Sequence, residues 1–148
     1  FGHMRLGPLD RTVALGDSAV AIGYGCVQGL TDAALAPLVE AQPDWFTSVE
    51  PLPEPALQGM LLAGVWVACS GALQLYDPAR TRGSAGGALG ACTLSWGSSC
   101  SLVLFLLWAL GENGLGPGLA GNEVDFFTGS LSVMAAWRLL CVNTLPPL

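Results

Sequence analysis

Charged residues leave long uncharged stretches along this chain, and these stretches predict membrane-spanning helices. Residues 56–76 carry no charge and lie between Glu54 and Asp77, and residues 84–110 carry none either. About 20 apolar residues in a helix are enough to cross the hydrocarbon core of a bilayer. Both segments are therefore predicted to be transmembrane helices.

Two further apolar stretches contain isolated charges. Residues 12–39 include Asp17 and Asp32, and residues 126–145 include only Arg138. We predict that both also cross the membrane, although the first could instead be an amphipathic helix lying in the plane of the interface. The predicted fold is all-α, with about four transmembrane helices in a bundle joined by short loops.

The charges between these stretches give an independent test of the four-span prediction. The arginines outside the spans are Arg5, Arg11, Arg80 and Arg82. The other two loops hold only acids, which are Glu40, Asp44, Glu50 and Glu54 in one and Glu112, Glu123 and Asp125 in the other. Four spans place every loop arginine on one side, together with both chain ends, as membrane proteins prefer. Three spans would scatter the arginines over both sides.

Composition supports a membrane protein rather than a soluble one. Charged residues make up 11% of the 148 residues and hydrophobic residues 52%, whereas a soluble domain usually carries about 25% charged residues. The length suits a single membrane domain, residues 1–148. A very apolar soluble domain remains the alternative. The net charge of −6 argues against binding to nucleic acid and against docking on anionic lipid through a polybasic patch.

Small residues recur at every fourth position in each predicted span. Two long rows are Ala21, Gly25, Gly29 and Ala33 in the first span, and Gly83, Gly87, Ala91, Ser95 and Ser99 in the third. Shorter rows are Gly64, Ala68 and Ala72 in the second span, and Thr128, Ser132 and Ala136 in the fourth. Small residues let helices approach closely in lipid. We therefore predict that the rows are helix contacts within this chain or with a neighbour. The large residues of the third span, Leu102, Leu104, Phe105, Leu107 and Trp108, would then face lipid, pigment or partner subunits.

Residues suited to catalysis or metal binding are scarce. The only histidine is His3, near one end of the chain, so we expect no histidine-based nucleophile, no metal site and no haem. The charges inside the spans, Asp17, Asp32 and Arg138, suggest either a structural ion pair or a polar translocation path. Asp17 and Arg138 lie roughly 7 and 10 Å below the same membrane face in the four-span arrangement. We predict that these two residues form an ion pair.

The whole chain resembles, in general character, small nuclear-encoded accessory subunits of algal photosynthetic complexes. The likeness rests on an acidic composition without lysine, short loops and the scarcity of catalytic residues. It implies a chloroplast thylakoid membrane, partners that are other integral membrane subunits and lipids, and chlorophyll or carotenoid at the lipid-facing surface. Without a histidine in the spans, a chlorophyll magnesium would need a backbone carbonyl, a water or an amide side chain. The candidate amides are Gln28, Gln58, Gln74 and Asn143.

These observations favour a non-catalytic structural or assembly subunit of a large membrane complex, with a thylakoid photosystem as the first assignment. The mitochondrial inner membrane is the alternative location. A second hypothesis is a small transporter or channel component that uses Asp17, Asp32 and Arg138. An intramembrane enzyme has no set of residues behind it. The chain begins at Phe1, which would fit a removed transit peptide, while Gly2-His3-Met4 could also be a remnant of cloning.

Overall fold

Five helices make up the described part of the chain. The computed structural model describes residues 9–40, 54–114 and 121–146. The helices are α1 (Arg11–Glu40), α2 (Glu54–Ala72), α3 (Pro78–Thr81), α4 (Ala85–Glu112) and α5 (Gly121–Thr144). These three ranges contain no strand, which confirms the predicted all-α class.

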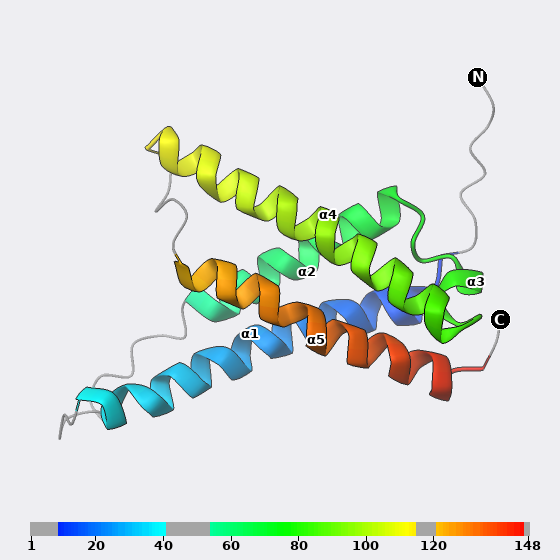
Figure 1. The fold of residues 1–148 in the computed structure, drawn as a ribbon, viewed down its shortest axis with the longest axis horizontal. Coiled ribbons are helices and arrows are strands. Elements are labelled where there is room, and N and C mark those ends of the chain that lie inside the picture. Colours follow the sequence, from blue (N-terminus) through cyan, green and yellow to red (C-terminus); the bar gives the residue numbers. More distant parts are fainter. Residues whose placement is uncertain (1–8, 41–53, 115–120, 147–148) are drawn as a thin grey trace.

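The four long helices form an up-and-down bundle. Each packs against two neighbours, in the ring order α1, α2, α4, α5, and the contact between α1 and α2 is the most extensive (Figure 1). The starts of α1 and α4, the whole of α3 and the end of α5 lie at one end of the bundle, on the right in Figure 1. Short connections between consecutive helices favour this antiparallel arrangement.

Three of these helices are long and apolar enough to cross a membrane. The candidate spans are Arg11–Ala34, Ala85–Glu112 and Val124–Thr144. The apolar part of α2, Leu57–Ala72, is shorter, and at 1.5 Å per residue it measures roughly 24 Å. The hydrocarbon core of a bilayer is about 30 Å thick. The described residues thus contain three candidate spans and one shorter apolar helix, where the sequence predicted about four full spans.

Helix α2 ends at Ala72 rather than at the predicted Tyr76, because the chain turns sharply there. Gln74 has a left-handed φ of 53°. The N–H of Leu75 donates to Ser70 O at 2.8 Å, and the N–H of Gln74 donates to Gly71 O at 3.1 Å. This pair of bonds is the Schellman ending of a helix, with glutamine where glycine is common. The turn folds the apolar residues after α2 back into the bundle instead of continuing the span.

Helix α3 is a short element that the sequence analysis did not predict. The Asp77 carboxylate caps it by accepting from the N–H of Ala79 at 3.1 Å, and Pro78 occupies its first turn. An aspartate cap followed by proline is a favoured way to start a helix. Ser84 caps α4 in the same manner, accepting from the N–H of Gly87 at 3.1 Å. The segment between α2 and α4 is therefore a capped turn of helix rather than a plain loop.

Small residues bring α1 and α2 into backbone contact. A Cβ atom added at Gly59 would lie 2.9 Å from Ala21 O and 3.2 Å from Gly25 Cα. Ala21 and Gly25 are buried, Gly29 is half-buried and Ala33 is exposed. Half of the first predicted row thus forms the contact with α2, as expected where two helices cross closely.

The other three rows behave differently from one another. In α4, Ala91, Ser95 and Ser99 are buried, Gly87 is half-buried, and Gly83 is exposed and precedes the helix. In α2 and α5 all the row residues are exposed, namely Gly64, Ala68, Ala72, Thr128, Ser132 and Ala136. Within the described part of the chain, these two rows therefore do not lie at a helix contact. The inward faces of α2 and α5 carry larger side chains instead, among them Trp66, Phe127 and Met134.

Charge separates the two ends of the bundle. The helix order brings Arg11, Arg80 and Arg82 to the end that holds α3, and Glu112 and Asp125 to the opposite end. Arg5, Asp44 and Glu50 of the predicted charge pattern, and the single histidine His3, lie outside the described residues. The outer surface between the ends is apolar, with Leu102, Phe105 and Trp108 exposed and Leu104 and Leu107 half-buried.

Candidate functional site

A buried ion pair joins α1 to α5. Arg138 Nε donates to Asp17 Oδ1 at 2.9 Å, and Arg138 Nη2 donates to Asp17 Oδ2 at 2.5 Å. Neither side chain has any exposed surface. The two parallel bonds form the bidentate geometry that a guanidinium and a carboxylate favour. The structure thus places in direct contact the two residues that the sequence analysis paired.

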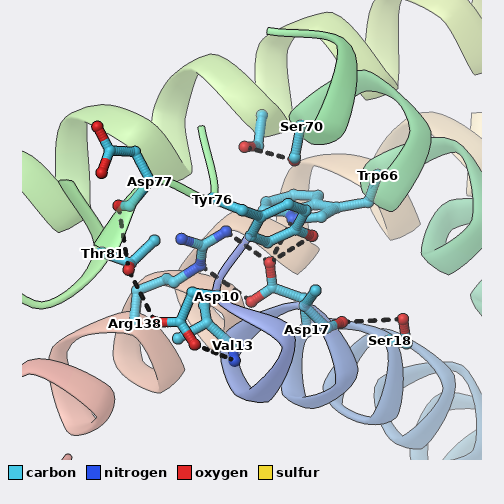
Figure 2. Close-up of polar contacts among 12 residues, drawn as sticks. Asp10, Val13, Asp17, Ser18, Trp66, Ser70, Tyr76, Asp77, Thr81 and Arg138 are labelled. Atoms are coloured by element: carbon cyan, nitrogen blue, oxygen red, sulfur yellow. Dashed lines mark hydrogen bonds and ion pairs between the residues drawn. The ribbon is translucent and has the colours of Figure 1, made fainter. Parts of the chain in front are cut away.

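Two aromatic side chains complete the surroundings of the Asp17 carboxylate. Trp66 Nε1 donates to Oδ2 at 2.8 Å, and the Tyr76 hydroxyl donates to the same oxygen at 3.0 Å. Figure 2 shows both rings beside the ion pair, and the Arg138 Cζ atom lies 5.2 Å from the centre of the Tyr76 ring. That geometry adds a cation–π attraction to the ion pair. The carboxylate therefore receives four hydrogen bonds, from α2, from the turn after α2 and from α5.

The turn at the end of α2 is what brings Tyr76 to this carboxylate. Had α2 continued as a straight helix, the chain at this point would have kept moving away from the bundle's centre along the helix axis. Instead the left-handed Gln74 reverses it, and Tyr76 is only 1% exposed. The carbonyl of Tyr76 also accepts from the N–H of Asp10 at 2.9 Å. The start of α1 is thus fixed to the end of α2 through the backbone as well as through side chains.

A second ion pair lies two helical turns away, at the end of the bundle that holds α3. Arg82 Nε donates to Asp10 Oδ2 at 2.6 Å, and Arg82 Nη2 donates to Asp10 Oδ1 at 2.7 Å. Thr81 Oγ1 donates to Asp10 Oδ2 at 3.0 Å, and Arg82 Nη1 donates to Pro146 O at 3.1 Å. This cluster ties together the start of α1, the end of α3 and the chain after α5.

Protonation of Asp10 is opposed by this cluster. Burial alone would raise the pKa of its carboxyl, but hydrogen bonds from Arg82, from the N–H of Val13 and from Thr81 outweigh burial and lower the pKa. The hydrogen bond to Asp10 raises the pKa of the Arg82 guanidinium. Both members of the pair therefore stay charged, which suits a structural contact between helices.

Serine hydroxyls extend the polar interior along α2 and α4. Ser70 Oγ donates to Ser95 Oγ at 2.8 Å, and both residues are fully buried. This bond lies beside the Tyr76 and Trp66 rings in Figure 2. Ser99 lies one turn further along α4, and its buried hydroxyl has no hydrogen-bond partner among the described residues. The buried Nη1 atom of Arg138 has none among them either. The polar interior thus runs from the α3 end toward the middle of the bundle.

The arrangement suits holding helices together better than doing chemistry. An ionised carboxylate offers about four acceptor positions, and Asp17 already receives four hydrogen bonds within the bundle. Three of these bonds reach Oδ2 and one reaches Oδ1, and the side chain has no exposed surface that a substrate could reach. Within residues 9–40, 54–114 and 121–146, no group of three or more His, Cys, Asp or Glu side chains is placed to hold a metal ion.

The candidate pigment ligands are spread over three helices and one turn. Gln28 is half-buried on α1 and donates from Nε2 to the Tyr24 hydroxyl at 3.2 Å. Asn143, which is exposed on α5, donates from Nδ2 to Leu139 O at 2.8 Å within its own helix. Gln58 is half-buried on α2, and Gln74 is exposed at the left-handed turn.

Asp32 does not join the other two charges of the predicted spans, Asp17 and Arg138. It is exposed on α1, and the fifteen residues that separate it from Asp17 correspond to roughly 22 Å along the helix. A polar path that used Asp17, Asp32 and Arg138 together would have to cross that distance. The described residues between them on α1 are mostly apolar or small.

Sequence reasoning missed most of the partners of the ion pair. Trp66 lies inside an uncharged span and gave no polar signal, and Tyr76 was assigned to the end of that span. The pair formed by Asp10 and Arg82 was read as loop charge. One signal could have suggested that Asp10 points into the bundle. Asp10 and Asp17 are seven residues apart, which is about two helical turns, so both should lie on the same side of α1.

Known proteins offer no relative from which to assign this site. No protein-family model matches the chain, and no match was found among curated proteins or solved structures. The functional argument therefore depends on the geometry described above.

Proposed function

We propose that this chain is a non-catalytic structural or assembly subunit of a larger membrane protein complex. The proposal depends on what the buried acids do. Asp10 and Asp17, the buried carboxylates of the described residues, each form a bidentate ion pair that joins helices. Such pairs fix how helices sit against one another. A bundle built in this way presents its outer surface, rather than an interior site, to other molecules.

The outer surface supports a role in packing. Beyond Val103 no described residue of α4 is buried, although this part of the helix is strongly apolar. Phe105 is 57% exposed and Trp108 is 52% exposed, and their rings lie 5.9 Å apart between centroids. Aromatic side chains of this kind dominate contacts between subunits. We propose that the part of α4 after Val103 contacts neighbouring subunits within the membrane.

The finer assignment is a photosystem complex of the chloroplast thylakoid, with the mitochondrial inner membrane as the alternative location. It rests on the acidic composition without lysine and the resemblance that this composition supports. Chlorophyll or carotenoid would then lie against the exposed apolar side chains, with Gln28, Gln58, Gln74 or Asn143 as single amide ligands. Fractionation of organelles and an absorption spectrum of the purified protein test the location and the pigment.

Native electrophoresis of mildly solubilised membranes tests the central proposal. The chain should migrate in a complex far larger than its own 15.2 kDa, and mass spectrometry of that band should identify the partner subunits. The double variant Phe105→Ala/Trp108→Ala should release the chain from the complex. Leu15→Ala, an apolar change at a still more exposed position on α1, serves as the control and should leave the complex intact.

Migration of the chain alone would contradict the proposal. The transporter hypothesis would then gain if the purified protein carried out transport in vesicles and if Asp17→Asn abolished that transport. The geometry gives this alternative less support, since the Asp17 side chain is fully buried in its ion pair and Asp32 lies far along α1 from that pair.

A further inference from the structure

Two arginines at the α3 end of the bundle form no ion pair within the described part of the chain. Arg11 is the first residue of α1 and Arg80 lies in α3, and both are exposed. The ion pairs that the structure contains use the other two described arginines. Arg11 and Arg80 therefore carry charges that no described side chain neutralises.

The contact between Asp10 and Thr81 holds these two arginines near each other. Arg11 follows Asp10 directly, Arg80 precedes Thr81 directly, and Thr81 Oγ1 donates to Asp10 Oδ2 at 3.0 Å. Arg82 reinforces this contact by its bidentate pair with Asp10. The two exposed arginines thus sit on a rigid junction between α1 and α3.

The junction has a net positive charge. The charge of Asp10 is matched by Arg82. Asp77 is the remaining acid of the junction; it is exposed and its carboxylate caps α3. The exposed charges of the junction are therefore one acid and two arginines, in a protein whose overall charge is −6.

We propose that Arg11 and Arg80 together bind the phosphate group of an anionic phospholipid in the adjacent leaflet. Figure 1 shows the starts of α1 and α4 and the short α3 at one end of the bundle. In a membrane that α1 and α4 cross, this end would lie at the level of the lipid headgroups. Guanidinium groups bind phosphate oxygens through paired N–H donors. Two arginines fixed on one junction form a local site, in contrast to the polybasic patch that the overall charge argues against. The inference rests on the proposed membrane location but not on the role in a complex.

Native mass spectrometry of the purified full chain tests this site. The protein is mixed in detergent with equal amounts of phosphatidylglycerol, which is anionic, and phosphatidylcholine, which has no net charge. The chain should carry phosphatidylglycerol in preference. Near a membrane surface each arginine contributes about fivefold to anionic lipid binding, so Arg11→Gln and Arg80→Gln should each reduce the preference by about that factor.

Three controls make the result specific. Arg11→Lys/Arg80→Lys keeps the positive charges but loses the paired N–H donors, so it should retain only part of the preference, and Asp125→Asn, at the opposite end, should not change it. Added inorganic phosphate should not displace the lipid. Equal binding of both lipids, a preference that survives Arg11→Gln/Arg80→Gln, or displacement by phosphate would overturn the site. A chain that binds neither lipid and stays soluble without detergent would instead contradict the membrane location.

Discussion

Replacing Arg138 with glutamine would leave the Asp17 carboxylate buried with only two of its four hydrogen-bond donors, Trp66 and Tyr76. Removing one partner of a buried ion pair typically costs about 3–5 kcal/mol, because the remaining charge has no counter-charge. Both side chains are fully buried here, so the penalty should not be reduced by water. We expect Arg138→Gln to lower the free energy of unfolding by about 3–5 kcal/mol, and Asp17→Asn by a similar amount.

The double variant Asp17→Asn/Arg138→Gln separates the pairing from the two individual losses. It removes both charges at once, and the two amides can hydrogen-bond to each other, so the total loss should fall short of the sum of the single losses by about 2–3 kcal/mol. Reversible unfolding by SDS in mixed micelles, followed by circular dichroism, measures each free energy. Asp32→Asn, at an exposed position on the same helix, is the control and should stay within about 0.5 kcal/mol of the parent.

Two results would refute this reasoning. Strictly additive losses would mean that Asp17 and Arg138 do not interact energetically in the membrane. Single variants as stable as Asp32→Asn would mean that water or another group replaces the lost partner.

Three other predictions test the packing, the topology and the second ion pair. Gly59→Leu should destabilise the bundle by about 1–3 kcal/mol, because a Cβ atom there lies 2.9 Å from a backbone oxygen of α1, whereas Gly64→Leu, with nothing within 4 Å of its Cβ, should have little effect on unfolding in micelles. In a background without native cysteines, Arg80→Cys and Asp125→Cys should react with a membrane-impermeant reagent from opposite sides of sealed vesicles, and labelling from the same side would contradict the bundle topology. The lowered pKa of Asp10 means that its ion pair stabilises the protein above the ordinary aspartate pKa of about 3.9 and is lost as the pH falls through the lower, folded-state value. The stability difference from Asp10→Asn should therefore be constant between about pH 5 and 7 and shrink below about pH 4 in micelle unfolding experiments.

The bounds of a helix could be predicted from the sequence where a long apolar stretch determines them, and less well where a turn ends the helix. Helix α1 follows the apolar stretch 12–39 closely, and helix α4 follows the uncharged stretch 84–110. The predicted end of α2 was wrong, because nothing in the apolar run up to Tyr76 indicates that Gln74 adopts a left-handed conformation. A glycine at this position would have predicted the turn, because glycine is the usual residue at a left-handed helix end, and glutamine is not.

The site was predictable only where charge made it visible. Asp17 and Arg138 stood out in apolar surroundings, and their similar depth suggested that they meet. Trp66 and Tyr76 have apolar bodies and a single polar atom each, so their hydrogen bonds to Asp17 depend on the fold and not on any local pattern. The rows of small residues were ambiguous for the same reason, since a period of four identifies a helix face but not the direction in which that face points.

The separation of the ion pair along the chain has a consequence for how the protein is made. Arg138 follows Asp17 by 121 residues, and at about 5–20 residues per second its synthesis comes roughly 6–24 s later. Trp66 and Tyr76 follow Asp17 by only 49 and 59 residues, so these two donors emerge from the ribosome in less than half that time. During the interval they can hold the carboxylate between α1 and α2 before α5 exists. Arg138 is thus the last of the hydrogen-bonding partners of Asp17 to be synthesised.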